Sequence, residues 1–143
     1  MKVLILCTGN SCRSQMAHGF LQSFDPNLQV FSAGTNPAEK TNPKAVEVMG
    51  EVGVDINNHS PHNVSEYLNE PWDYVITVCG GAKESCPCFT GDVKHRLHLG
   101  FTDPSDFKGS EKDTLNEFRR VRDEIKDEFN RLYNDYCKRK GDI

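Results

Sequence analysis

The chain has 143 residues and a formal net charge of −4, with 36% hydrophobic and 27% charged residues. This balance is typical of a single globular domain, expected here over residues 1–143, and it argues against a general binder of nucleic acid or of anionic membranes. No apolar stretch approaches membrane-spanning length, and the apolar start is too short for the core of a signal peptide, so we expect a cytoplasmic protein.

Two short apolar runs near the N-terminus, residues 3–6 and 28–31, predict buried strands, and the second stops at Gly34. The segment between them has apolar side chains at helical spacing. It is expected to end before Pro26, because a proline disfavours helix in the residue that precedes it. The expected buried stripe of this helix is Met16, Ala17, Phe20, Leu21 and Phe24.

A second helix is predicted to start at Asn42 and Pro43, which have the residue types of an N-cap and a first helical position. Gly53 is typical of the residue just beyond a helix end. The loop that follows contains His59 and His62, which we expect to be solvated surface residues. The expected buried stripe of the helix is Ala45, Val46, Met49 and Val52.

The second half of the chain predicts two more strands and a long helix. Residues 74–78 are continuously apolar, as parallel core strands are, and residues 96–101 alternate apolar and polar side chains. Residues 82–92 are ambiguous. The long helix should begin at Ser110, with solvated faces of mixed charge around a buried stripe of Leu115, Phe118, Val121, Ile125, Phe129, Leu132 and Tyr136.

Strands that alternate with helices predict an α/β fold, with one mostly parallel four-stranded sheet flanked by helices. Ligands in such folds bind beyond the carboxyl ends of the strands. Cys7, Cys79 and Asp103 each follow a predicted strand. We therefore expect these three side chains to converge at one edge of the sheet.

The first strand is joined to the first helix by Cys7-Thr8-Gly9-Asn10-Ser11-Cys12-Arg13-Ser14. Backbone N–H groups in such a loop point inward, and the helix end adds about half a positive charge, so the loop predicts an oxyanion site closed by the planar fork of Arg13. The same field should lower the pKa of Cys7 to about 3.5–7.5 and make its thiolate a nucleophile. A strand–loop–helix corner without chemistry is the simpler alternative.

Asp103 precedes Pro104, which fixes the loop and lets the carboxyl group be aimed. A reaction at an oxyanion needs a proton for the departing oxygen, so Asp103 is a candidate general acid. The alternative is an ordinary turn, since Asp-Pro is common in turns.

The chain has 6 cysteines: Cys7, Cys12, Cys79, Cys86, Cys88 and Cys137. In a reducing cytosol, clustered cysteines point to metal binding or catalysis. Cys79 and Cys86 are compatible with a thiol relay or with two free buried cysteines. A further alternative is a zinc site made of Cys86, Cys88, His95 and His98. The spacing departs from the usual zinc patterns, so we expect no metal site.

The loop from Cys7 to Ser14 resembles the phosphate-binding loop of the low-molecular-weight protein tyrosine phosphatases and of the arsenate reductases that share their fold. Over nearly the full chain, the resemblance is to the thioredoxin-coupled arsenate reductases. It is carried by Ser32-Ala33-Gly34, Asn42-Pro43, Val52-Gly53-Val54-Asp55, Thr77-Val78-Cys79-Gly80, Cys86-Pro87, Gly100-Phe101-Thr102-Asp103-Pro104 and residues 119–125.

This resemblance implies an arsenate reductase in which Cys7 is the nucleophile, Cys79 the intermediate thiol and Cys86 the terminal thiol. Thioredoxin would regenerate the thiols, no cofactor would stay bound, and the chain would act as a monomer. Arg13 and Asp103 match the family's catalytic positions. The implied oxyanion-binding residues are Thr8, Gly9, Asn10, Ser11, Cys12, Arg13 and Ser14.

The chain also departs from the family pattern. Some members have a glutamate at the position of His18 that contributes to a structural potassium site; His18 puts that site in question here, although Asn10 and Ser32 remain. Ser105 follows Pro104, where tyrosine phosphatases usually have an aromatic residue. A tyrosine phosphatase is therefore the second hypothesis, and a redox or metal-binding regulator without turnover is the third.

The implied Cys79–Cys86 disulfide constrains the chain between these residues. In a helix, seven residues separate two Cα atoms by about 10 Å, whereas a disulfide needs them within about 7 Å. We therefore expect oxidation to loop out residues 80–85.

Overall fold

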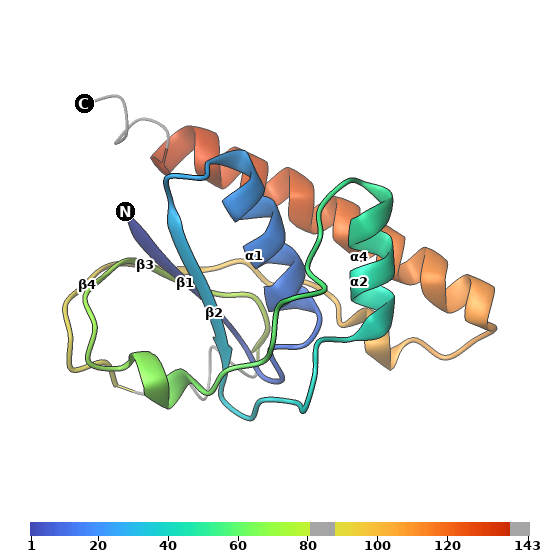
Figure 1. Cartoon of the computed structure of the whole chain (residues 1–143), viewed down its shortest axis with the longest axis horizontal. Helices are drawn as coiled ribbons and strands as arrows, with labels where there is room; N and C mark the ends of the chain where they lie inside the picture. The colour runs from blue at the N-terminus through green and yellow to red at the C-terminus, as the bar shows by residue number, and fades with distance from the viewer. Residues whose placement is uncertain (81–87, 138–143) are drawn as a thin grey trace.

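Four parallel strands form one sheet in the order β2-β1-β3-β4 (Figure 1). The computed structural model describes residues 1–80 and 88–137. The strands are β1 (Lys2–Cys7), β2 (Gln29–Gly34), β3 (Trp72–Thr77) and β4 (Val93–His98). The predicted α/β fold with a parallel four-stranded sheet is confirmed.

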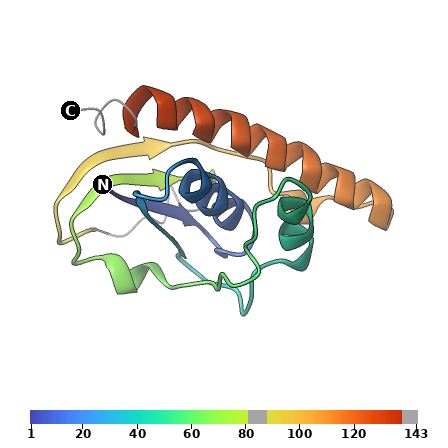
Figure 2. The same ribbon diagram turned by 45° about the horizontal axis from the view of Figure 1, so that its top comes forward.

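The helices lie beside the sheet and pack against one another (Figure 2). They are α1 (Arg13–Phe24), α2 (Pro43–Glu51) and α4 (Glu111–Leu132), with short 3-10 turns at Val64–Tyr67 and Pro104–Asp106 and a π-helical turn at Tyr133–Cys137. α1 packs against β1, β2 and α4, and α2 packs against α1 and α4. No helix in the described ranges is both long and apolar enough to cross a membrane.

The predicted signals for helix ends are confirmed. The Asn42 side chain accepts a hydrogen bond from Lys44 N (2.9 Å), and Ser110 Oγ accepts one from Asp113 N (3.1 Å). Gly53 has a φ of 80°, the left-handed conformation that glycine adopts without strain. The starts of α2 and α4 and the end of α2 thus lie where the local sequence predicts them.

Two details of the predicted elements are wrong. On α2, Val48 is fully buried and Val52 is 37% exposed, because the helix ends at Glu51 and Val52 lies beyond its packed face. β4 runs over residues 93–98, so Leu99 and Phe101 lie past its end. Both errors come from extending a periodic pattern beyond the last hydrogen-bonded turn or pair.

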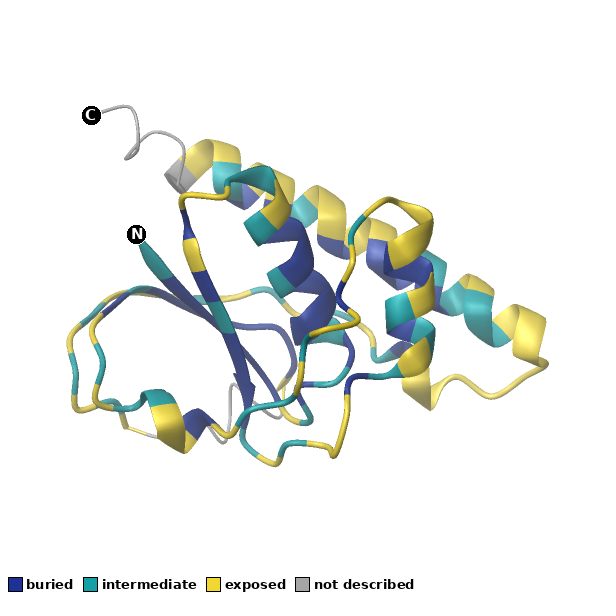
Figure 3. Cartoon of the chain, in the orientation of Figure 1, coloured by how far each residue is buried: buried dark blue, intermediate teal, exposed yellow. Residues whose placement is uncertain are grey.

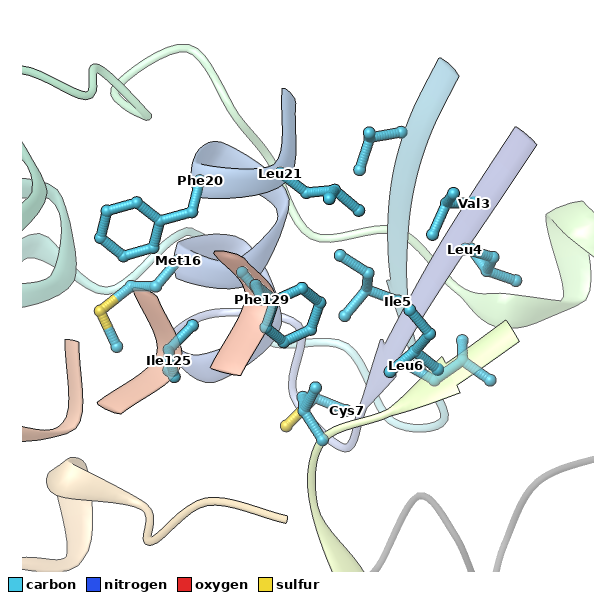
Figure 4. Packing of buried hydrophobic residues seen from close by; sticks show 14 of the residues in the cluster. Val3, Leu4, Ile5, Leu6, Cys7, Met16, Phe20, Leu21, Ile125 and Phe129 are labelled. Atoms are coloured by element: carbon cyan, nitrogen blue, oxygen red, sulfur yellow. The ribbon is translucent and has the colours of Figure 1, made fainter. Parts of the chain in front are cut away.

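The core lies between the sheet and the helices (Figure 3). Apolar side chains from β1 pack with those of α1 and α4, as seen for Ile5, Leu6, Met16, Phe20, Leu21, Ile125 and Phe129 (Figure 4). One charged residue joins them, against the expectation that only apolar residues of α4 are buried. Arg122 is 8% exposed and donates to Val48 O (2.9 Å) and to Glu51 (2.9 Å), and these bonds tie α4 to α2.

The register brings the predicted site residues to one end of the sheet. Cys7 pairs with Gly34, and Leu6 pairs with Thr77, which in turn pairs with His98. Cys79 and Asp103 therefore follow neighbouring strand ends, as the sequence predicted.

Gly34 provides a test of how tightly this end is packed. A Cβ atom at Gly34 would overlap the Thr8 carbonyl oxygen and lie 3.1 Å from Asn10 N. We expect Gly34→Ala to lower the free energy of unfolding by about 1–3 kcal/mol, as overpacking does. Chemical denaturation measures it.

Gly50→Ala is the matched control, because a Cβ atom there would meet nothing within 4 Å and the residue lies inside α2. That substitution should raise stability by about 0.5–1 kcal/mol. Equal effects of the two alanines would rule out a close approach at Gly34.

Candidate active site

The loop after β1 turns its carbonyl oxygens outward. Three backbone hydrogen bonds hold them, from Asn36 N to Thr8 O (2.9 Å), from Ala38 N to Gly9 O (2.8 Å) and from Asn42 N to Ser11 O (2.8 Å). Within the described residues, no protein acceptor takes the N–H groups of residues 9–12. The loop therefore offers donors to a bound anion, as the sequence led us to expect.

Asn10 fixes the shape of this loop. It is fully buried and has a φ of 52°, which asparagine tolerates better than most residues. Its side chain donates to Ser14 Oγ (2.8 Å) and accepts from His62 N (2.9 Å), and its carbonyl oxygen accepts from Gln15 Nε2 (3.0 Å). These bonds hold Asn10 in a conformation that the loop needs.

Arg13 closes the loop from the side of Asp103. Its Nη1 donates to Phe101 O (3.1 Å) and its Nη2 to Asp103 Oδ2 (3.3 Å), whereas Nε is buried and has no partner among the described residues. Asp103 Oδ1 also accepts from Ser105 N (3.0 Å) and Ser105 Oγ (2.6 Å). Arg13 thus keeps one buried donor for a ligand while Asp103 is held by three donors.

A cavity of about 180 Å³ opens between these groups. It is lined by Cys7, Thr8, Gly9, Asn10, Ser11, Cys12, Arg13, Asp103 and Ser105. Of the predicted oxyanion-binding residues, Ser14 alone is not in the lining, because its hydroxyl accepts from Asn10 behind the loop.

Cys7 lines this cavity, and the Cys79 side chain lies against Cys7 outside the lining. Both residues are buried, at 4% and 3% exposure, and their side chains are hydrogen-bonded to each other. Thr8 Oγ1 lies 3.4 Å from Cys79 Sγ. The convergence predicted for two of the relay thiols is therefore present in the folded chain.

The predicted low pKa of Cys7 is wrong for this state. The hydrogen bond with Cys79 and burial raise the pKa of the Cys7 thiol, and they outweigh the lowering by Arg13 and by the Thr8 N–H. Burial, followed by the charge of Asp103, likewise raises the pKa of Cys12. The sequence showed the groups that stabilise a thiolate, namely Arg13 and the N–H groups of the loop. It could not show that the Cys79 side chain lies against the Cys7 thiol.

The three further cysteines are Cys86, Cys88 and Cys137, and only the side chain of Cys88 lies in the described part of the chain. Cys88 is exposed. Cys86 and the predicted looping of residues 80–85 lie outside the described residues, apart from Gly80 itself. Cys137 belongs to the terminal turn, and its side chain also lies outside.

The two histidines of the alternative zinc site do not share a face of β4. His95 stacks on Tyr74 with ring centroids 4.9 Å apart, whereas His98 Nδ1 is 2.8 Å from Thr77 Oγ1. Residues three apart in a strand point to opposite sides. In the described part of the chain, no cluster of three or more His, Cys, Asp or Glu side chains could hold a metal ion.

Sequence reasoning missed several residues that shape the site. Ser105 holds Asp103 and lines the cavity, and Gly34 lets the loop approach. Gln15 and His59 form a second support, since His59 Nδ1 is 3.0 Å from Gln15 Oε1. A serine two residues after an aspartate is a local capping signal that could have identified Ser105; the other contacts are long-range.

A cluster of imidazoles lies behind the loop, and the prediction that His59 is merely solvated is wrong. The rings of His18 and His59 are 4.5 Å apart, and His18 Nδ1 is 2.9 Å from Ser32 Oγ. Burial, with smaller contributions from His59 and His62, lowers the pKa of His18 to about 3. Burial also lowers the pKa of His59.

The fold and this loop define a class of protein. The model of the family described as low molecular weight phosphotyrosine protein phosphatase matches residues 2–141, and the chain belongs to this family. The predicted family is thereby confirmed.

Relatives at 41–44% identity are arsenate reductases, and the solved structures that share the fold include arsenate reductases and a tyrosine phosphatase. The chain is 44% identical over 124 residues to an arsenate reductase of Bacillus subtilis strain 168, which covers 86% of this chain and 88% of the relative. A solved arsenate reductase in the phosphate-binding state has a TM-score of 0.77 and 30% identity over 92% of this chain and 95% of that one. A thioredoxin-dependent arsenate reductase of Corynebacterium glutamicum has a TM-score of 0.58 and 27% identity, over 90% of this chain and 61% of that one.

The histidine cluster predicts a pH dependence of stability. The pKa of His18 is about 3 in the folded protein against an ordinary 6.5, so between these values the unfolded chain binds a proton that the folded chain does not. Stability should therefore fall as pH decreases below 6.5, by about 1.4 kcal/mol per unit from this group.

Urea denaturation of wild type and His18→Gln between pH 7 and 5 measures this, and the variant should show the smaller slope. His95→Gln changes an exposed imidazole on β4 and serves as the control. Parallel pH profiles for wild type and His18→Gln would contradict a lowered pKa of the half-buried His18.

Proposed function

We propose that this protein is an arsenate reductase that works through a relay of Cys7, Cys79 and Cys86 and is regenerated by thioredoxin. The observation that carries the proposal is the hydrogen bond between the side chains of Cys79 and Cys7, because Cys7 lines the oxyanion cavity. Hydrolysis of a phosphate ester needs the cavity and one thiol, whereas reduction of an oxyanion needs a second thiol within reach of the first. The relatives named above, which are arsenate reductases, support the same assignment.

In the first step, Cys7 sulfur bonds to arsenic while one arsenic–oxygen bond breaks. Arsenate has the shape and charge of phosphate, so the loop N–H groups and Arg13 Nε can hold it. The departing oxygen leaves as water, and the proton that Cys7 gives up balances the proton that this oxygen gains. We assign the transfer to Asp103, which lines the same cavity.

The raised pKa of Cys7 makes this proton transfer part of the reaction. The resting thiol is protonated, so attack requires that its proton be removed as the sulfur–arsenic bond forms. A site that transfers the proton to the leaving oxygen avoids building up a free buried thiolate.

In the second step, Cys79 sulfur attacks Cys7 sulfur. The sulfur–arsenic bond breaks, its electron pair stays on arsenic, and arsenite leaves with the proton from Cys79. The two cysteines have supplied two electrons and form a disulfide. Cys86 then attacks Cys79 and frees Cys7, and thioredoxin reduces the Cys79–Cys86 disulfide by exchange.

The test of this function is arsenate-dependent turnover of the purified protein, with thioredoxin or glutaredoxin and their reductases as the source of electrons. We expect multiple turnovers with thioredoxin only, and none for Cys7→Ser. Hydrolysis of aryl phosphates without arsenate reduction would make the protein a phosphatase instead.

Cys79→Ser and Cys86→Ser should each stop multiple-turnover arsenate reduction while sparing hydrolysis of a small aryl phosphate. Such hydrolysis uses only the cavity, Cys7 and Asp103. Steady-state assays of both reactions measure the split. Cys88→Ser, which changes an exposed thiol, is the control and should leave both activities intact; equal loss of the two activities in Cys79→Ser would argue against a dedicated relay.

Asp103→Asn should slow the first chemical step by about 10²–10⁴-fold, because an amide cannot carry the proton. Single-turnover kinetics with excess enzyme measure that step, and circular dichroism checks that the fold persists. Asp106→Asn changes an exposed carboxylate of the same turn and is the control. A normal rate in Asp103→Asn would leave Asp103 with only its role in the turn.

A further inference from the structure

A second cavity, of about 280 Å³, lies behind the oxyanion loop. It is lined by Gln15, His18, Phe31, Ser32, Asn58, His59, Ser60, His62 and Tyr67. None of these side chains is a carboxylate. A cation bound here would therefore meet no formal negative charge from the lining.

The family resemblance raises the question of potassium at this place, since some members have a glutamate where His18 stands. Potassium is coordinated by oxygen atoms, and in proteins these come from carbonyl, carboxylate and similar groups. His18 offers a ring nitrogen and the bulk of an imidazole instead. The donor set present does not fit the ion.

The two side-chain oxygens that remain from the family's site, those of Ser32 and Asn10, already have protein partners. Ser32 Oγ is 2.9 Å from His18 Nδ1, and Asn10 Oδ1 accepts from His62 N (2.9 Å). The His18 ring is held in turn by the ring of His59, with centroids 4.5 Å apart. Ser32, His18 and His59 are thus linked to one another by direct contacts.

This network leads directly to the oxyanion loop. His59 contacts the Gln15 amide (3.0 Å), Gln15 donates to Asn10 O (3.0 Å) and Ser60 O (3.2 Å), and Asn10 donates to Ser14 (2.8 Å). Gln15 is 1% exposed, so these bonds are shielded from water. The rear of the loop is therefore supported by hydrogen bonds from the protein's own side chains and backbone.

We infer that in this chain the imidazole of His18 takes the place of a structural potassium ion and that the oxyanion loop is held without any monovalent cation. Stability and oxyanion affinity should consequently be the same in potassium, sodium and choline salts of equal ionic strength.

Thermal unfolding and calorimetric binding of inorganic phosphate, each in potassium, sodium and choline chloride, test this. For wild type we expect the unfolding temperature and the phosphate dissociation constant to be unchanged among the three salts. His18→Glu supplies the missing carboxylate beside Ser32, and potassium should raise its unfolding temperature over choline by about 2–6 °C at ten times the ion's dissociation constant.

His95→Glu makes the same charge change on the exposed edge strand and should show no potassium effect. If His18→Glu does not fold, His18→Gln offers a neutral oxygen ligand at the same position. A wild-type protein stabilised by potassium over sodium and choline would overturn the inference. If potassium leaves the unfolding temperature of wild type, His18→Glu and His18→Gln unchanged, the conclusion that His18 replaces the ion is overturned.

Discussion

The oxyanion site depends on the close approach between the loop after β1 and the end of β2. Gly34 pairs with Cys7, and its lack of a side chain lets the Thr8 carbonyl oxygen lie against it. The chain after Gly34 can then donate to the carbonyl oxygens of Thr8, Gly9 and Ser11. Because these oxygens face away from the cavity, the N–H groups of the loop are left available to it. The cavity can therefore offer hydrogen-bond donors to an anion beside Cys7 and Arg13.

The same packing that builds the cavity also raises the pKa of the Cys7 thiol that lines it. Cys7 and Cys79 are buried and hydrogen-bonded to each other, which raises the pKa of Cys7 in spite of Arg13. A thiol is a much poorer nucleophile than a thiolate, so a raised pKa makes Cys7 less reactive toward electrophiles in general. In the proposed reaction Asp103 passes the Cys7 proton to the departing oxygen, which would couple substrate binding to activation of the thiol.

The sequence predicted the fold and the location of the site because both follow from local patterns. The apolar run before Cys7, the capping residues Asn42 and Ser110, and the strand ends before Cys79 and Asp103 are all readable one segment at a time. The contacts that set the chemistry are of another kind. The Cys7–Cys79 contact, the approach at Gly34 and the ring contact between His18 and His59 join segments far apart in the chain, so no local pattern reveals them.

The central claim is that Cys79 resolves the arsenic adduct on Cys7. Its most direct test uses Cys86→Ser, fully reduced, mixed with an equimolar amount of arsenate, quenched in acid, alkylated and analysed by peptide mass spectrometry. We expect a disulfide between the Cys7 and Cys79 peptides and release of an equal amount of arsenite. Arsenite formed without that disulfide, or a disulfide from Cys7 to Cys12, would contradict the account.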